Sequence, residues 1–238
     1  MKKNSLFVLL ALSCHLSGQE ISGEKIKGSG SLITEERVLS TFTDIQAEGC
    51  FDVIITQDAS QKLSVKTDDN IMAYVKTEVS GGKLRIFFSD KSRSYSPTSA
   101  TVTISSSFIE NISISGSGSV KSTNQLKSKN PRYSISGSAN MNLSVTAESI
   151  ETNIAGSGDI DLKGSASSAK HNISGSGNIK ALSLSSPQVK VSIAGSGNCL
   201  IDVQSSLDVS ITGSGNVQYE GSPQITSHIV GSGKVKQH

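Results

Sequence analysis

The sequence predicts an all-β fold: a single-stranded parallel β-helix, expected to be right-handed, with an irregular strand-rich cap at its N-terminal side. Three observations lead to this prediction. An Ile-x-Gly-Ser-Gly motif recurs seven times at intervals of 18 to 21 residues, as in stacked repeat proteins. Apolar and polar residues alternate through and beyond each motif. Aromatic residues make up only 4% of the chain and Trp is absent, so the core must be built from β-branched side chains.

The first residues resemble an export signal. Lys2 and Lys3 precede a short apolar run at 6–12, which predicts a signal peptide over 1–18. Seven apolar residues are too few to cross a bilayer. Plain cleavage is the favoured outcome, and lipidation of Cys14, in a lipobox-like Ala-Leu-Ser-Cys, is the alternative. We therefore expect an exported protein.

Residues 19–40 form a lead-in segment, and residues 41–110 form a strand-rich N-terminal part. The expected strands are Phe51–Ile55, Leu63–Val65, Thr77–Val79, Lys83–Phe88 and Thr101–Ile104. Asp69 and Asn70 are expected to cap a short helix over 71–76, and 91–99 is expected to be a polar loop. This part should begin the same sheets as the repeat and cap them, because an open β-helix end exposes strand edges.

Residues 111–238 carry the repeat, continuous with the preceding part. The first glycines of the seven copies are Gly116, Gly137, Gly156, Gly175, Gly195, Gly213 and Gly231. Within each copy the Ile, both glycines and the next apolar residue share one parity, which places them on the inward face of a strand. A coil of this length has a perimeter of about 60 Å. The glycines should lie where the wall bends or where walls approach, and Ala139 shows that the second position need not require positive φ.

The opposite parity forms polar columns of serine and asparagine. The candidate residues are Ser157, Ser176, Ser196, Ser214, Asn178, Asn198 and Asn216. They could form a ladder of hydroxyl and amide groups that stabilises neighbouring coils, or a flat polar strip that binds a glycan or a protein. Equivalent serines in seven copies cannot all be nucleophiles, so the pattern does not predict a catalytic serine.

No catalytic, cofactor-binding or metal-binding cluster is expected. Cys199 falls in the inward apolar column and should be a small buried side chain. His171 is expected to face inward and His228 outward, without the convergent ligands that a metal needs. Whether Cys50 pairs with Cys199 is left open. Removing Lys2 and Lys3 from the 22 basic residues leaves 20 against 20 acidic ones, so no nucleic-acid partner is expected.

Several segments together resemble a known family. They are Phe42–Ile45, Phe51–Gln57, Asp69–Ile71, Val75–Val79 and Gly82–Leu84, followed by the Gly-Ser-Gly repeats. The sequence is similar, over about residues 41–230, to the "putative auto-transporter adhesin, head GIN domain" family. The resemblance implies an exported β-helical domain common in Bacteroidetes, and therefore a protein of the periplasm, outer membrane or cell surface of a Gram-negative bacterium. It implies no particular catalytic or ligand-binding residues.

The function expected is an exported, non-catalytic binding or adhesion scaffold that presents a polar solenoid wall to a glycan or to an envelope or surface protein. Two alternatives remain: a periplasmic envelope-stress or signalling accessory protein, and a polysaccharide-cleaving β-helix enzyme. The enzyme is disfavoured because Arg is scarce, with only Arg37, Arg85, Arg93 and Arg132 in the chain. Whether copies of the chain associate is left open.

Overall fold

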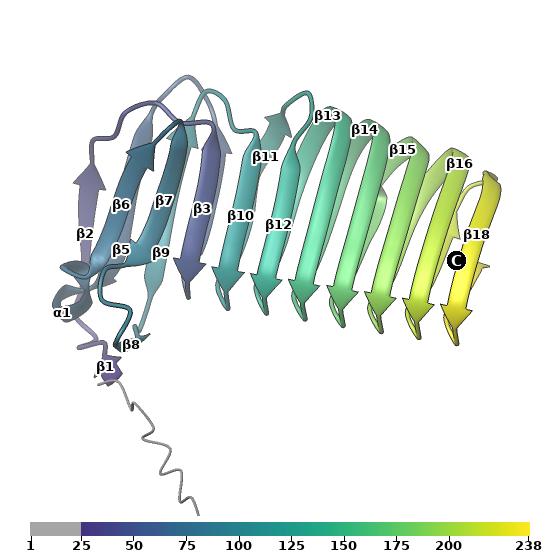
Figure 1. The fold of residues 1–238 in the computed structure, drawn as a ribbon. Coiled ribbons are helices and arrows are strands. Elements are labelled where there is room, and N and C mark those ends of the chain that lie inside the picture. Colours follow the sequence, from purple (N-terminus) through teal and green to yellow (C-terminus); the bar gives the residue numbers. More distant parts are fainter. Residues whose placement is uncertain (1–24) are drawn as a thin grey trace, which may run out of the picture.

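The computed structural model describes residues 25–238, so the expected signal peptide and Cys14 lie outside the described residues. The fold is a β-solenoid of stacked parallel coils with a cap at its N-terminal end (Figure 1). Each coil contributes a strand to two walls, joined at a Gly-Ser-Gly corner. The predicted all-β solenoid is confirmed.

The repeat consists of ten strands. They are β10 (Asn111–Gly116), β11 (Ser119–Lys127), β12 (Arg132–Gly137), β13 (Asn140–Gly156), β14 (Asp159–Gly175), β15 (Asn178–Gly195), β16 (Asn198–Gly213), β17 (Asn216–Glu220), β18 (Gln224–Gly231) and β19 (Lys234–Gln237). We call the wall that ends at the first glycine of each motif wall A; it contains β10, β12, the second halves of β13 to β16, and β18. Wall B contains β11, the first halves of β13 to β16, β17 and β19.

The pairing register follows the repeat. In wall A, Gly156 is paired with Gly175, which is paired with Gly195, and the series continues to Gly213 and Gly231. The inward isoleucines stack in the same way, since Ile154, Ile173 and Ile193 of successive coils are each 2% exposed. The seven motif copies therefore occupy equivalent places in successive coils, as the period predicts.

The two glycines of each motif have different roles. Gly175 has φ +125° and lies at the corner, half-buried, so the prediction that both glycines point inward is wrong for the first one. Gly177 is buried and has no positive φ, but a Cβ there would lie 2.3 Å from the carbonyl oxygen of Gly158 in the preceding coil. Both glycines thus leave room for the backbone of the preceding coil, and only the first also makes the bend.

The cap contains nine strands and one helix. They are β1 (Lys25–Lys27), β2 (Leu32–Arg37), β3 (Asp44–Gly49), β4 (Asp52–Gln57), β5 (Lys62–Asp68), α1 (Asp69–Met72), β6 (Val75–Ser80), β7 (Lys83–Phe88), β8 (Ser94–Ser96) and β9 (Ala100–Ser106). Strands β3 and β4 pair in parallel with β10 and β11, so they extend walls A and B. Antiparallel pairs β2–β5, β5–β9 and β6–β7 complete the cap.

Three local expectations for the cap change. The helix spans Asp69–Met72 rather than 71–76, because β6 begins at Val75 and pairs with β7. The segment 91–99 contains β8, which pairs in parallel with β1. The lead-in segment contributes β1 and β2 to the cap. Within residues 25–238, α1 has only four residues, and no helix there is long and apolar enough to span a bilayer.

A column of larger and polar side chains runs through the core of wall A. Tyr133, Thr152 and His171 occupy the same register position in three successive coils, and all are buried. The Thr152 hydroxyl and His171 Nδ1 are hydrogen-bonded at 2.7 Å. Burial lowers the pKa of His171 to about 4. Cys199 is fully buried in wall B, as expected from its place in the inward column.

The hydroxyl of Tyr133 has no hydrogen-bond partner although the residue is fully buried. A buried polar group without a partner costs free energy. We expect Tyr133→Phe to raise the free energy of unfolding by about 1 kcal/mol, measured by urea denaturation. The matched control is Tyr219→Phe, at a half-buried position, which should have little effect. A Tyr133→Phe variant less stable than the parent would contradict this account.

Candidate functional site

The outer face of wall A carries a shallow groove of about 510 Å³. Two outward columns of small side chains line it. The first column includes Ser134, Asn153, Asn172 and Ser192, and the second includes Ala155, Ser174 and Ala194. The groove spans six successive strands from β10 to β16. At about 4.8 Å between strands, its length is about 24 Å. Such a surface can hold an extended chain lying across the strands.

Paired charges border this groove. The next outward column of wall A contains Arg132, Glu151, Lys170, Lys190 and Asp208. Arg132 Nη2 lies 2.7 Å from Glu151 Oε2, Lys170 Nζ lies 3.1 Å from Glu151 Oε1, and Lys190 Nζ lies 2.7 Å from Asp208 Oδ2. The column contains three basic and two acidic residues, so the border carries both signs of charge and no strong excess of either.

Asparagines connect coils through their side chains. In the groove, Asn172 Nδ2 donates to Asn153 Oδ1 at 2.9 Å and to Glu151 Oε1 at 3.3 Å. At the start of wall B, Asn178 Nδ2 donates to Asp159 Oδ1 at 2.8 Å. The chain of amides continues from Asn198 to Asn178 at 3.0 Å and from Asn216 to Asn198 at 3.1 Å. The asparagines singled out from the sequence thus lie in an amide ladder between coils.

The serines singled out from the sequence lie elsewhere. Ser157, Ser176, Ser196 and Ser214 are exposed at the corners. Their main-chain N–H groups donate to the first glycine of the preceding coil, with distances of 2.8 to 2.9 Å. The groove is formed instead by residues one and three positions before that glycine, such as Ala194 and Ser192. The sequence feature that indicates the groove is the small size of most outward residues one and three positions before the first glycine of each motif.

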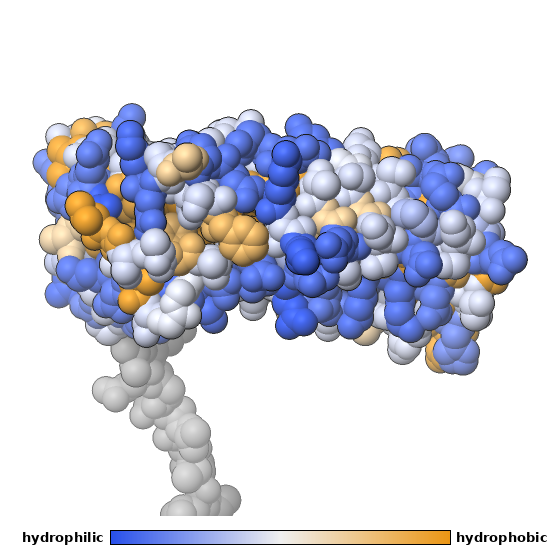
Figure 2. Space-filling view, turned by 90° about the horizontal axis from the view of Figure 1, so that it is seen from above, coloured by the Kyte–Doolittle hydropathy of each residue, from blue (hydrophilic) through white to orange (hydrophobic). Residues whose placement is uncertain are grey.

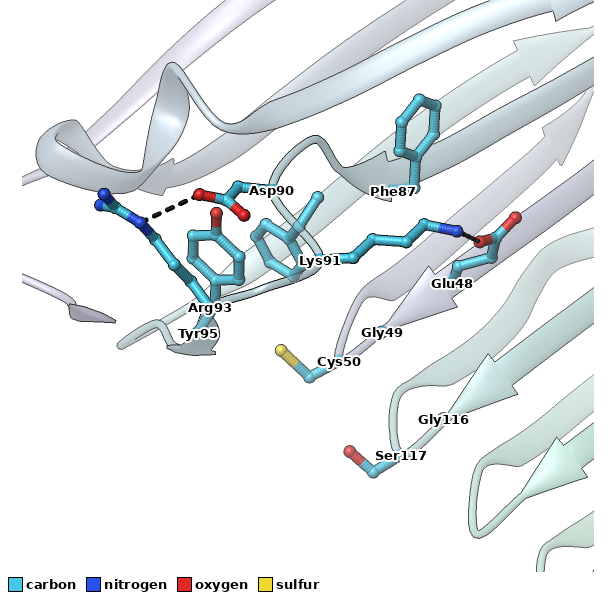
Figure 3. Close-up of a pocket in the computed structure, with 11 residues that line it drawn as sticks. Glu48, Gly49, Cys50, Phe87, Asp90, Lys91, Arg93, Tyr95, Gly116 and Ser117 are labelled. Carbon is cyan, nitrogen blue, oxygen red and sulfur yellow. Dashed lines mark ion pairs between the residues drawn. The ribbon is translucent and has the colours of Figure 1, made fainter. Parts of the chain in front are cut away.

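A second hollow, of about 440 Å³, lies where the cap meets the first repeat coil (Figure 3). Its lining comes from the corner Gly49–Cys50, the end of β7, the segment before β8, and the corner Gly116–Ser117. In Figure 3, Lys91 extends toward Glu48, and Arg93 toward Asp90, across the pocket wall. These two ion pairs measure 3.6 Å and 3.0 Å.

Aromatic rings stack beside this pocket, and two of them, Phe88 and Tyr95, also line it. Phe88 stacks between Phe51, at 4.6 Å between ring centroids, and Tyr95, at 4.3 Å. Tyr95 also contacts Tyr74 at 5.4 Å. Both faces of Phe88 are therefore occupied inside the protein, so this ring offers a ligand only its edge.

The polar groups of the pocket include an ion-paired carboxylate and a partly buried thiol. A hydrogen bond from Arg85, 2.8 Å from Glu48 Oε1, holds the pKa of Glu48 below its usual value. Burial raises the pKa of the Cys50 thiol, which keeps it protonated and weakly nucleophilic. Cys50 and Cys199 are both free thiols, so the disulfide left open by the sequence is not formed. In the part of the chain from residue 25 onward, no three His, Cys, Asp or Glu side chains could hold a metal ion.

Hydropathy differs along the molecule. Figure 2 shows hydrophobic side chains gathered toward the end that carries the cap, whereas the repeat presents mainly hydrophilic side chains on this face. In the cap, Leu32, Ile33, Val38 and Phe108 are the exposed large hydrophobic residues. In the repeat, the exposed large hydrophobic residues are Ile225, Ile229 and Val230, all on β18.

A family profile described as "putative auto-transporter adhesin, head GIN domain" matches residues 41–223. The chain belongs to this family. The match covers most of the cap and nearly all of the repeat, so the groove and the pocket both lie inside the family's domain. No curated protein is significantly similar in sequence.

Solved structures similar to this head GIN domain protein include three from Bacteroidales. A putative adhesin from Bacteroides fragilis has 29% identity and a TM-score of 0.83, with 90% of this chain and 100% of that chain covered. A putative adhesin from Parabacteroides distasonis has 26% identity and a TM-score of 0.73, with the same coverage. A structure named a putative lipid binding protein, also from Parabacteroides distasonis, has 27% identity and a TM-score of 0.77, with 90% and 100% covered.

Proposed function

We propose that this protein is an exported, non-catalytic binding scaffold whose wall A groove binds an extended glycan chain at the bacterial envelope or cell surface. The observation that carries the proposal is the groove itself: a hollow lined by small hydroxyl, amide and methyl groups that repeat once per coil. Similar structures named putative adhesins support a binding role.

The repeat geometry favours a linear polymer over a compact ligand. Donors and acceptors recur at the strand spacing of about 4.8 Å, so a chain of similar units can make the same contact in each coil. Small side chains let such a chain approach the sheet closely. No charged side chain of residues 25–238 lines the groove, which favours a neutral glycan over a polyanion such as nucleic acid.

Filling the groove tests this proposal. Ala194 is exposed in the second groove column, so Ala194→Lys places a long side chain across the path of a bound chain. Once a glycan panel has identified the ligand, we expect Ala194→Lys to weaken its binding at least about tenfold, or about 1.4 kcal/mol. Calorimetry or surface plasmon resonance with that glycan measures the change.

The matched control is Asn142→Lys, which is also exposed but lies on the outer face of wall B. It adds the same charge but should leave binding unchanged. Absence of binding across the glycan panel would refute the glycan proposal, and binding only of extended peptides would assign the groove to a protein partner. Equal loss in both variants would show that charge, and not the groove, controls affinity.

A further inference from the structure

The two ends of the solenoid are built differently. At the N-terminal end, β2 is an edge strand, and its Arg37 and Glu35 lie opposite the buried Leu63 and Val65 of β5. These charged residues therefore occupy inward positions and pair with each other at 3.3 Å. Arg37 also donates to Thr77 on the other edge strand, β6, at 3.2 Å. Inward charges on an edge strand oppose the addition of another strand.

The C-terminal end has none of these features in its wall A strand. On β18, Ile225 and Ile229 are paired with the buried Leu207 and Ile211 of β16, yet they are 42% and 37% exposed. All eight residues of β18 are exposed, and its sequence contains no Lys, Arg, Asp, Glu or Pro. Nothing within residues 25–238 pairs with its outer edge, which lies at the yellow end of Figure 1.

We propose that two copies of the chain form a two-fold symmetric dimer by antiparallel pairing of β18 with β18. The strand is self-complementary in this arrangement. With the two-fold axis at Ser227, Ile225 of each copy lies opposite Ile229 of the other, and Thr226 lies opposite His228. Opposed residues of an antiparallel pair project from the same face of a sheet. Both isoleucine pairs then extend the apolar core across the junction.

The difference between the two ends of the solenoid favours a closed dimer over an open chain of stacked copies. Head-to-tail stacking would join β18 to an N-terminal edge that carries the inward Arg37–Glu35 pair, and would leave these charges buried. Pairing through β18 instead uses the same surface on both copies and leaves no open end of this kind, as in isologous dimers. The outward groove columns continue from Ser210 and Thr212 to His228 and Val230. In the proposed register Val230 of each copy lies opposite Gln224 of the other, so the two wall A grooves reach the junction on opposite sides of the axis.

Sedimentation velocity of the purified chain, from about 1 to about 200 µM, measures the association. We expect the mass of two chains at high concentration. The double variant Ile225→Lys and Ile229→Lys should be monomeric over the whole range. Its matched control is Ile33→Lys, which is 39% exposed at an inward position of the opposite edge strand β2 and should remain dimeric.

A disulfide cross-link tests the proposed β18–β18 register directly, without lysine substitutions that disrupt the edge of β18. In a Cys50→Ser background, Ser227→Cys places a thiol on the two-fold axis, within reach of its symmetry mate. Oxidation should give a covalent dimer, whereas Ser80→Cys, exposed on the edge strand β6, should stay uncross-linked. A parent chain that remains monomeric at every concentration, open-ended polymers, or a failure of Ser227→Cys to cross-link would each overturn the proposal.

Discussion

Gly175→Ala should lower the free energy of unfolding by more than about 3 kcal/mol. Two separate effects produce this loss. Gly175 has φ +125°, a conformation that an L-residue adopts only under strain. A Cβ at this position would also lie 2.3 Å from the carbonyl oxygen of Gly156. That oxygen accepts from Ser176 N at 2.9 Å, so it cannot move without breaking the contact between coils.

Two controls are compared with this variant by chemical denaturation. Ser176→Ala, exposed in the same corner, should change stability by less than about 0.5 kcal/mol. Gly81→Ala lies at φ +57° with nothing within 4 Å of the added Cβ, so it measures the milder strain of the left-handed helical region without a steric contact and should cost about 1 kcal/mol. If Gly175→Ala cost no more than Gly81→Ala, close packing of the coils at the corner would not be the dominant effect.

Acidification should destabilise the protein through His171. Its pKa is about 4 in the folded state because of burial, against about 6.5 for an unperturbed histidine. Between these values the unfolded chain binds the proton and the folded chain does not, so stability falls as the pH falls. The difference corresponds to a loss of about 3 kcal/mol from pH 7 to pH 4.

Denaturation series at several pH values measure this slope, and His171→Val should flatten it between pH 6.5 and pH 4.5. Valine occupies the same register position in the next coil, at Val191. The control His238→Ala removes a histidine that is exposed near the C-terminus and should keep the parental slope. Below this range, carboxyl groups with lowered pKa, such as that of Glu151, add their own acid dependence. An unchanged slope in His171→Val would contradict the assignment.

Much of the repeat could be derived from the sequence. The period of the motif places Gly156 beside Gly175 and Gly195, and the alternation of side chains places Ile173, His171 and Cys199 inside. These features depend on neighbours within one coil and on identical neighbours in the next. Local periodicity is therefore sufficient to derive them.

The junction between cap and repeat could not be derived in this way. Gly49, Cys50 and Phe51 occupy the corner position that Gly116, Ser117 and Gly118 fill in the next coil, since β3 and β4 pair with β10 and β11. The paired residues Asp52 and Ser119 are 67 residues apart. A single corner with Cys and Phe in place of Ser and Gly gives no repeat signal, and only the folded cap brings it into register.

The sequence by itself determined the solenoid, its coil length and which side chains face its core, because these follow from backbone alternation and an 18 to 21 residue period. The tertiary structure decided where the surface is hollow and where the stack is open. The groove depends on the relative sizes of outward side chains in adjacent columns. The open edge depends on which strands lack a neighbour: Ile211 and Ile229 are both inward isoleucines, but only Ile211 is covered.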